Sequence, residues 1–188
     1  MSIKIWYDPP DYFWVDELLT DEHKRIRSAV REWVNRAVIP VIDDTNQKHE
    51  FPRHLIRELG EIGALGSYIP EVYGGAGMDQ ISYGLIMQEL ERGDSGIRSM
   101  ASVQSSLVMY PIYKYGSEEQ KARLLPGLAK GKIVGAFGLT EPNYGSDIDG
   151  MLSKFTDHGD HYLLNGSKMW ITNAPIADVC VVWAKDGA

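Results

Sequence analysis

The chain has 188 residues, with 19 Lys and Arg against 26 Asp and Glu, and a net charge of −7 at pH 7. This acidic balance argues against a nucleic-acid partner, because binding phosphates requires a basic face. No dense basic run marks a membrane-surface patch, and no apolar stretch approaches the roughly 20 residues of a transmembrane helix. The composition predicts a globular protein of one large or two small domains.

Two helices are predicted between residues 20 and 66. Behind Thr20, an N-cap residue, apolar side chains recur at helical spacing as far as Val38, and Pro40 ends the pattern. A second apolar series follows Pro52 and reaches Leu65. Close packing or an early stop is predicted by the glycines that interrupt it, Gly60, Gly63 and Gly66.

Three more helices are predicted before residue 130, after a stretch of loop composition at residues 69–77. Caps and breakers mark their ends. The first begins behind Asp79 and is broken by Gly93, the second opens at Ser95 and runs to about Tyr110, and the third has the capping box Ser117 and Gln120.

The hydrophobic period changes to that of strands from Ile133 onward. Strands are expected over residues 133–140, 152–157, 161–164, 168–172 and 178–185. Asn165-Gly166 predicts a hairpin turn, because glycine tolerates the positive φ of such turns.

Helices followed by antiparallel strands predict an α+β fold. An amino-terminal helical domain is expected over residues 1–130, and the start of an antiparallel β barrel or sheet domain over residues 131–188. A sheet of so few strands, in a β region that ends at residue 188 directly after its last strand, looks incomplete, and further elements are expected beyond it.

Three segments combine residue types that suit a binding site. Residues 137–147 leave a predicted strand into a Pro/Gly loop, whose N–H groups and hydroxyls can bind an oxygen-rich ligand. In residues 168–173, Trp170 offers a flat apolar wall for an aromatic cofactor, with Thr172 as a donor to a ring nitrogen. In residues 91–99, Arg98 can hold a carboxylate with its planar fork.

Each segment also has a purely structural interpretation. The first is an ordinary turn at the end of a strand, and Trp170 on a strand is core filler. Arg98, one turn into a helix, is a solvated surface charge. Taken singly the patterns are weak, and their combination carries the functional prediction.

The order of these motifs resembles that of the acyl-CoA dehydrogenase family. LTEP and GSD at residues 139–147, followed by NGxKxWITN at residues 165–173, form a distinctive pair. Residues 69–75 are similar to the family's PExYGG loop and residues 115–121 to its YGSEEQK helix start. The resemblance extends from about Leu18 to Asp186.

Within the family, the segment from Arg98 to Leu107 is similar to the glutaryl-CoA dehydrogenase version, since enzymes for simple fatty acyl chains lack that arginine. Ile148 departs from the pattern, because the family often has proline after the GSD motif. This change lies on the flank of the loop.

FAD is the cofactor that the resemblance implies. Trp170 would flank the isoalloxazine ring, and Thr172 would hydrogen-bond near N5, the atom that receives hydride. Fixed donors near N5 and the ring carbonyls stabilise the negative charge of a reduced flavin. The expected contacts are Phe137, Gly138, Leu139, Thr140, Glu141, Gly145, Ser146, Trp170, Ile171 and Thr172.

The implied reaction is α,β-dehydrogenation of an acyl-CoA thioester, with electrons passed to an electron-transferring flavoprotein. In a glutaryl-type enzyme Arg98 would hold the distal carboxylate, and loss of CO2 after oxidation would give crotonyl-CoA. The expected substrate contacts are Arg98, Ser99, Ser102 and Ser146.

By the same resemblance the general base is a glutamate on a carboxy-terminal four-helix bundle, which would lie beyond residue 188. That domain also helps to bind FAD and builds a homotetramer. No catalytic base and no metal ligand is therefore expected in this chain, and Glu141 is expected to have another role. The chain alone is expected to retain FAD weakly or not at all.

Three alternatives stay open. The chain could act on a different acyl-CoA, pass electrons to oxygen as an acyl-CoA oxidase, or serve as a truncated binding or scaffold module. Since the start of the chain has neither a secretion nor an import pattern, a cytoplasmic location is expected for a bacterial protein. A eukaryotic protein of this type would be expected in the mitochondrial matrix.

Overall fold

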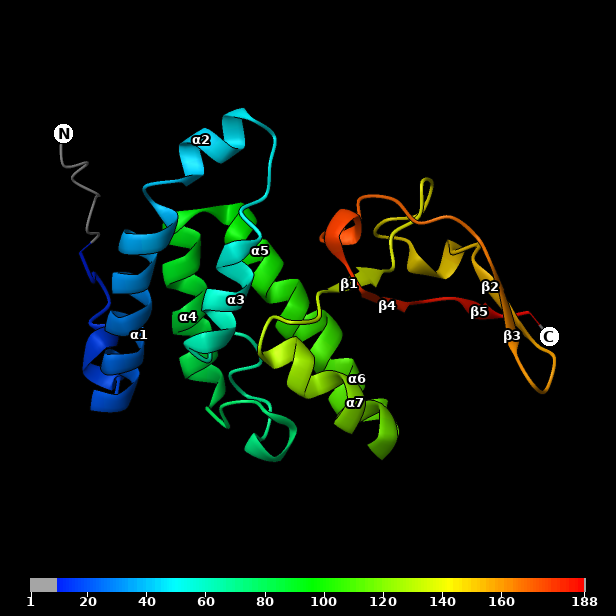
Figure 1. Cartoon of the computed structure of the whole chain (residues 1–188), viewed down its shortest axis with the longest axis horizontal. Coiled ribbons are helices and arrows are strands. Elements are labelled where there is room, and N and C mark those ends of the chain that lie inside the picture. Colours follow the sequence, from blue (N-terminus) through cyan, green and yellow to red (C-terminus); the bar gives the residue numbers. More distant parts are fainter. Residues whose placement is uncertain (1–9, 188) are drawn as a thin grey trace.

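The computed structural model describes residues 10–187, and Figure 1 shows the helices gathered in one body with the strands beside it. Helices come first along the chain and strands follow, which confirms the α+β plan. Residues 1–9 and 188, which belong to the two predicted domains, lie outside the described part. In residues 10–187 no helix has the length and apolar character needed to cross a bilayer.

The α-helices are α1 (Asp21–Trp33), α2 (Ile42–Gln47), α3 (His54–Glu61), α4 (Gln80–Gly93), α5 (Ser95–Ser102), α6 (Tyr110–Tyr115) and α7 (Glu118–Ala129). Two π-helical segments, η2 (Val34–Val38) and η4 (Val103–Met109), continue α1 and α5. Short 3-10 turns are η1 (Val15–Leu18), η3 (Glu71–Tyr73), η5 (Ile148–Gly150) and η6 (Ala174–Ile176).

Helix starts follow the expected side-chain caps. Thr20, Asp79 and Ser117 each accept a hydrogen bond from the backbone N–H three residues ahead, as N-cap residues do. The helical path begun by α1 ends at Val38, before Pro40, and α4 ends at Gly93.

The helix predicted from Ser95 begins at that residue, as α5, and differs from expectation at its other end. Asp94 is its N-cap, with the carboxylate accepting from Ile97 N at 2.9 Å. The helical path then continues through η4 and α6 to Tyr115, beyond the predicted end at Tyr110. Pro111 does not stop it, because proline is tolerated in the first turn of α6.

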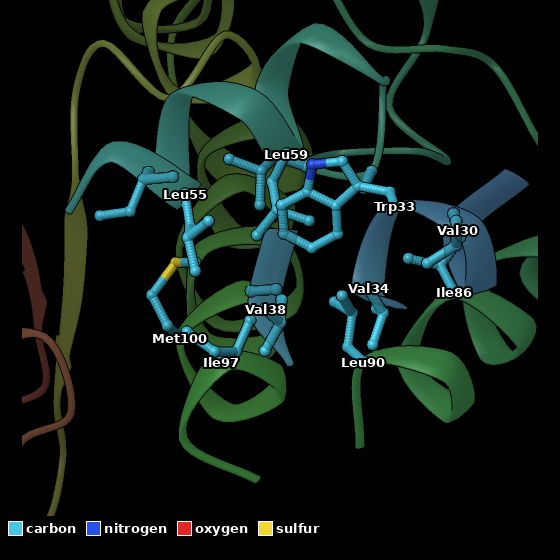
Figure 2. Close-up of a cluster of buried hydrophobic side chains, with 14 of the residues drawn as sticks. Val30, Trp33, Val34, Val38, Leu55, Leu59, Ile86, Leu90, Ile97 and Met100 are labelled. Carbon is cyan, nitrogen blue, oxygen red and sulfur yellow. The ribbon is translucent and has the colours of Figure 1, made fainter. Parts of the chain in front are cut away.

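Two apolar clusters share the continuous helix formed by α5 and η4. In the larger one, Trp33 is 2% exposed and lies among side chains of α1, α3, α4 and α5 (Figure 2). The smaller cluster packs η4 against α7 through side chains such as Val108 and Leu125. Because it is buried on two sides, the α5–η4 helix is a rigid support for whatever packs on its remaining face.

Gly60 is the single glycine within α3 and marks a close approach to α7. A Cβ at this position would collide with the backbone of Lys130 at the end of α7, so the two helices approach through glycine. The early stop is also confirmed, since α3 ends at Glu61 and is followed by Gly63 and Gly66 with positive φ.

We expect Gly60→Ala to lower the free energy of unfolding by about 1–3 kcal/mol, because backbone atoms of Lys130 cannot move aside as a side chain would. Gly84→Ala is the matched control, since Gly84 is exposed in α4 and has nothing within 4 Å of the place that an added methyl group would take. There alanine is expected to stabilise the helix by about 0.5–1 kcal/mol. Urea unfolding of both variants measures the difference, and equal effects would contradict the close contact.

The strands form two small sheets. One consists of β1 (Gly135–Gly138) and β4 (Val179–Val182), which pair in parallel, and Figure 1 places them where the helices meet the remaining strands. The other has the order β3-β2-β5, with β2 (Lys154–Asp157) antiparallel to β3 (Tyr162–Asn165) and parallel to β5 (Lys185–Asp186). The expected antiparallel arrangement thus holds for one pair, and the other two pairs are parallel.

Two sequence predictions in this region are wrong. Residues 168–172 are not a strand, because Trp170 adopts φ 59° and interrupts extended backbone. The hairpin turn lies at residues 158–161 and not at Asn165-Gly166, since Asp157 pairs with Tyr162. Gly159, with φ 88°, supplies the positive φ that the turn needs.

Candidate functional site

A cavity of about 250 Å³ lies where η4, the loop after β1 and the loop before η6 meet. Aliphatic residues, two threonines and two aromatic residues line it together. A larger hollow of about 450 Å³ between α6, α7 and β4 contains none of the residues predicted for a site. The smaller cavity is lined by Val103, Leu107, Phe137, Leu139, Thr140, Trp170, Ile171 and Thr172.

Trp170 is presented to solvent at the edge of this cavity. The residue is 83% exposed, so it is not packed into the core formed by residues 10–187. Its left-handed backbone costs of order 1–3 kcal/mol for a residue with a bulky side chain. An exposed indole on strained backbone gains nothing for folding and is typical of a surface that contacts a ligand.

The two loops that carry Thr140 and Thr172 are held against each other. Met169 N donates to Thr140 O at 2.9 Å, and Lys168 Nζ donates to Leu139 O at 2.9 Å. The cavity therefore has hydroxyl groups on two separate chain segments whose spacing is fixed by hydrogen bonds.

Glu141 is a second link between the same loops. Its buried carboxylate accepts from Leu152 N at 2.7 Å and Ser153 N at 2.8 Å, and from Lys168 Nζ at 2.9 Å. Ser153, Leu152 and Lys168 outweigh the opposing effect of burial and lower the pKa of Glu141 to about 2. A carboxylate so weakly basic and so fully hydrogen-bonded cannot serve as a general base near pH 7.

The other predicted cofactor contacts lie outside the lining of this cavity. Gly138 is buried in β1, where it pairs with Val182 of β4. Gly145 and Ser146 are exposed in the turn that follows Glu141. Of the four residues that carry the flavin prediction, Thr140, Trp170 and Thr172 are brought together, whereas Ser146 lies apart on the same loop.

Arg98 lies on the helix that forms one wall of the cavity. Its Nε donates to Glu91 at 2.6 Å, and 37% of its side chain is exposed. The Arg98 and Ser95 side chains hydrogen-bond the Glu91 carboxylate and lower its pKa. This contact uses one of the five N–H groups of the guanidinium, so its fork can still bind a second carboxylate.

Of the predicted substrate residues on this helix, Ser99 shares a face with the cavity wall, whereas Arg98 and Ser102 are rotated away from Val103 by about 140° and about 100°. Ser99 precedes Val103 by four residues, and Val103 precedes Leu107 by four, which places them in one row along the helix. Arg98 lies about 7.5 Å before Val103 along the axis, at a rise of about 1.5 Å per residue. Ser99 and Ser102 are both half-buried, and the Ser102 carbonyl accepts from Ser106.

Sequence reasoning did not identify Val103, Leu107 or Lys168 as parts of a site. Val103 and Leu107 have the spacing of any core-facing pair, so the pattern alone does not reveal their role. The opposite charges of Glu141 and Lys168, one in each motif, were an available signal for a link between the loops. In residues 10–187 no group of three or more His, Cys, Asp or Glu side chains is arranged to hold a metal ion.

Comparisons with known proteins give relatives that match most of this chain. The chain is 40% identical over 173 residues to a glutaryl-CoA dehydrogenase of Desulfococcus multivorans, a match that covers 90% of this chain and 44% of that protein. It is 38% identical over 169 residues to mitochondrial isovaleryl-CoA dehydrogenase of Bos taurus, covering 89% and 40%. A glutaryl-CoA dehydrogenase from Mycobacterium smegmatis, solved in complex with FADH2, has a TM-score of 0.90 at 46% identity and covers 93% and 45%.

This chain thus spans less than half the length of the relatives it matches. The family model for the acyl-CoA dehydrogenase N-terminal domain matches residues 20–132, and that for the middle domain matches residues 136–188. The chain belongs to the acyl-CoA dehydrogenase family.

Proposed function

We propose that this chain supplies the helical wall and the first flavin-binding loops of an FAD-dependent dehydrogenase that acts on glutaryl-CoA. The observation that carries the proposal is the cavity in which exposed Trp170 meets the hydroxyl-bearing residues Thr140 and Thr172. Arg98, about 1.4 helical turns before Val103 on the same helix, supports a substrate with a distal carboxylate.

The residues present fit a flavin. An isoalloxazine ring has a flat apolar face and a polar edge, and the cavity offers a flat indole together with hydroxyl groups. Trp170 would stack beside the ring, and Thr140 and Thr172 would donate hydrogen bonds to its edge. When bound, the flavin supplies the acceptor for the hydride that leaves the substrate β-carbon.

Arg98 would hold the distal carboxylate of glutaryl-CoA. Its guanidinium stays charged at any physiological pH, and its planar fork matches a carboxylate in two parallel hydrogen bonds. Glu91 restrains the arginine through Nε and thereby orients the rest of the fork. Ser99 and Ser102, on the same stretch of helix, are proposed as further donors to the substrate, and Ser146 as a contact from the flavin loop.

The general base is not proposed from this chain. Glu141 directly follows the cavity residue Thr140, but its carboxylate accepts hydrogen bonds from two backbone N–H groups and from Lys168. We place the base, the remainder of the FAD site and the contacts of a homotetramer in a sequence that continues beyond residue 188. An electron-transferring flavoprotein is the proposed electron acceptor, and a cytoplasmic location stays a prediction.

The second candidate is dehydrogenation of another acyl-CoA. It is favoured by the 38% identity to isovaleryl-CoA dehydrogenase, a protein named for a branched acyl group without a second carboxylate. The two candidates share the flavin loops and differ in the role of Arg98.

The test joins residues 1–188 to the carboxy-terminal part of the Mycobacterium smegmatis glutaryl-CoA dehydrogenase that they do not match; we call this polypeptide the extended protein. We expect it to bind FAD stoichiometrically and to oxidise glutaryl-CoA in preference to isovaleryl-CoA and butyryl-CoA, with an electron-transferring flavoprotein as acceptor. Product analysis for crotonyl-CoA reports on CO2 loss. Preference for isovaleryl-CoA would favour the second candidate, turnover with oxygen alone would indicate an oxidase, and failure to bind FAD would refute both.

A further inference from the structure

We propose that Gln104 and Asn173 are positioning residues for the cavity. Through hydrogen bonds to the backbone of Gly135, at the start of β1, they hold the η4 helix and the Trp170 loop in place against β1. The proposal rests on the proposed function, because it assigns these side chains the task of setting the spacing of the flavin-binding loops. Neither residue lines the cavity itself.

Gln104 joins the helical wall to the start of β1. Its side chain is fully buried within η4, and its Oε1 accepts from Gly135 N at 2.8 Å. Its Nε2 donates to Leu128 O at 2.9 Å and to Ile133 O at 2.7 Å. One amide thus satisfies three backbone groups, on α7, on β1 and on the connection between them.

Asn173 joins the Trp170 loop to the opposite side of the same unit. Its Nδ2 donates to Gly135 O at 3.0 Å and lies 3.5 Å from Met100 O on α5. The residue is 9% exposed and adopts φ 68°, a conformation that asparagine tolerates better than most residues. Thr172 precedes it directly, so the position of Asn173 fixes where Thr172 can lie.

Gly135 itself is pressed against the helix. A Cβ at this position would lie 2.5 Å from Val108 Cγ1 on η4, so β1 begins in contact with the helical wall. Phe137, two residues further, and Thr140, at the start of the loop after β1, are both cavity residues. The three chain segments that line the cavity therefore meet at Gly135, each through a short connection.

The chemistry of the contacts explains why amide side chains are needed. The N–H of Gly135 is bonded by a side chain from the helical wall, and its C=O by a side chain from the Trp170 loop. Buried backbone groups must be hydrogen-bonded, and an amide offers a donor and an acceptor without introducing charge. An apolar side chain of equal size would leave these groups unsatisfied and free the segments to shift relative to one another.

Hydrogen–deuterium exchange on the 188-residue chain tests this inference. We expect Gln104→Met, which keeps the volume and removes the hydrogen bonds, to speed exchange about tenfold or more over residues 135–140 and 170–174. Exchange in α1 and α4 should stay unchanged. Asn173→Gly is the second variant, because glycine accepts the positive φ and the substitution removes the amide side chain without straining the backbone.

Ile86→Ala is the control, since Ile86 is 1% exposed in α4 and belongs to the larger core cluster. It is expected to lower the free energy of unfolding at least as much as Gln104→Met does. Exchange over residues 135–140 and 170–174 should then speed up only as much as exchange in the rest of the chain. Exchange that rises equally across the chain in Gln104→Met and Asn173→Gly, or stays at the wild-type level in both, would overturn the proposal.

FAD titration of the same variants in the extended protein gives an independent measurement. The affinity is expected to fall about tenfold for Gln104→Met and to stay within about twofold for Ile86→Ala. Equal losses in both would reduce Gln104 to a general stability role. If the unaltered extended protein binds no FAD, the proposed function fails, and the exchange pattern still decides whether Gly135 is the junction.

Discussion

Replacing Arg98 by Ala in the extended protein is expected to lower kcat/KM for glutaryl-CoA by about 10- to 100-fold and to leave that for butyryl-CoA within about twofold. A hydrogen bond to a charged group contributes about 1.5–3 kcal/mol, and about 1.4 kcal/mol corresponds to a factor of ten. Because 37% of the Arg98 side chain is exposed, this range applies and the larger values of fully buried ion pairs do not. Butyryl-CoA has no distal carboxylate and loses no contact.

Two further variants separate the shape of the arginine from its charge and its orientation. Arg98→Lys keeps the charge but not the planar fork, and is expected to fall between wild type and Arg98→Ala. Glu91→Gln keeps the size of the side chain that accepts from Arg98 Nε at 2.6 Å. It removes the negative charge and so weakens this hydrogen bond. We expect it to raise KM for glutaryl-CoA alone. Equal losses on both substrates in Arg98→Ala would show that the arginine acts on the fold and not on the carboxylate.

Glu141→Gln is expected to destabilise the chain near neutral pH, and the difference from wild type should shrink in acid. The folded-state pKa of Glu141 is about 2, below its ordinary value of 4.5. A carboxylate whose pKa is lowered by folding stabilises the protein fully above its unfolded-state pKa and loses that contribution as pH falls through the folded-state value. The gap in midpoint temperature should therefore be constant above about pH 5 and close between about pH 4.5 and 2.

Thermal unfolding of both proteins across this range measures the gap, down to the lowest pH at which each unfolds cooperatively. Other carboxylates with lowered pKa values, such as Asp79 beside Ser82 and His23, are present in both proteins and cancel in the difference. Lys168→Met removes the partner from the other loop and should show the same narrowing. A gap that does not change with pH would mean that the ionisation of Glu141 contributes nothing to stability. The glutamine of the variant would then destabilise the chain only because its hydrogen bonds have poorer geometry.

Helix starts could be predicted from the sequence because their determinants are local. Thr20, Asp79 and Ser117 satisfy backbone N–H groups three residues away, and no distant part of the chain decides this. Gly60 was correctly marked as a site of close packing, but its partner, the backbone of Lys130, lies 70 positions away and has no trace in the local pattern.

The Trp170 segment could not be predicted in its conformation. Its apolar and β-branched composition is that of a strand, whereas Trp170 and Asn173 adopt positive φ, and the Asn173 side chain contacts Gly135, which lies 38 positions away. Three of the residues that the motifs predicted for a flavin site, Thr140, Trp170 and Thr172, nevertheless line one cavity. The apolar wall of the cavity, Val103 and Leu107, could be recognised only once the folded helix was known.

A crystal structure of the extended protein with bound FAD tests the central claim most directly. We expect the isoalloxazine ring beside Trp170, with its edge within hydrogen-bonding distance of Thr140 and Thr172 and the Val103 side of η4 opposite. A flavin bound elsewhere, or a Trp170 side chain turned away into packed protein, would contradict the assignment of this cavity.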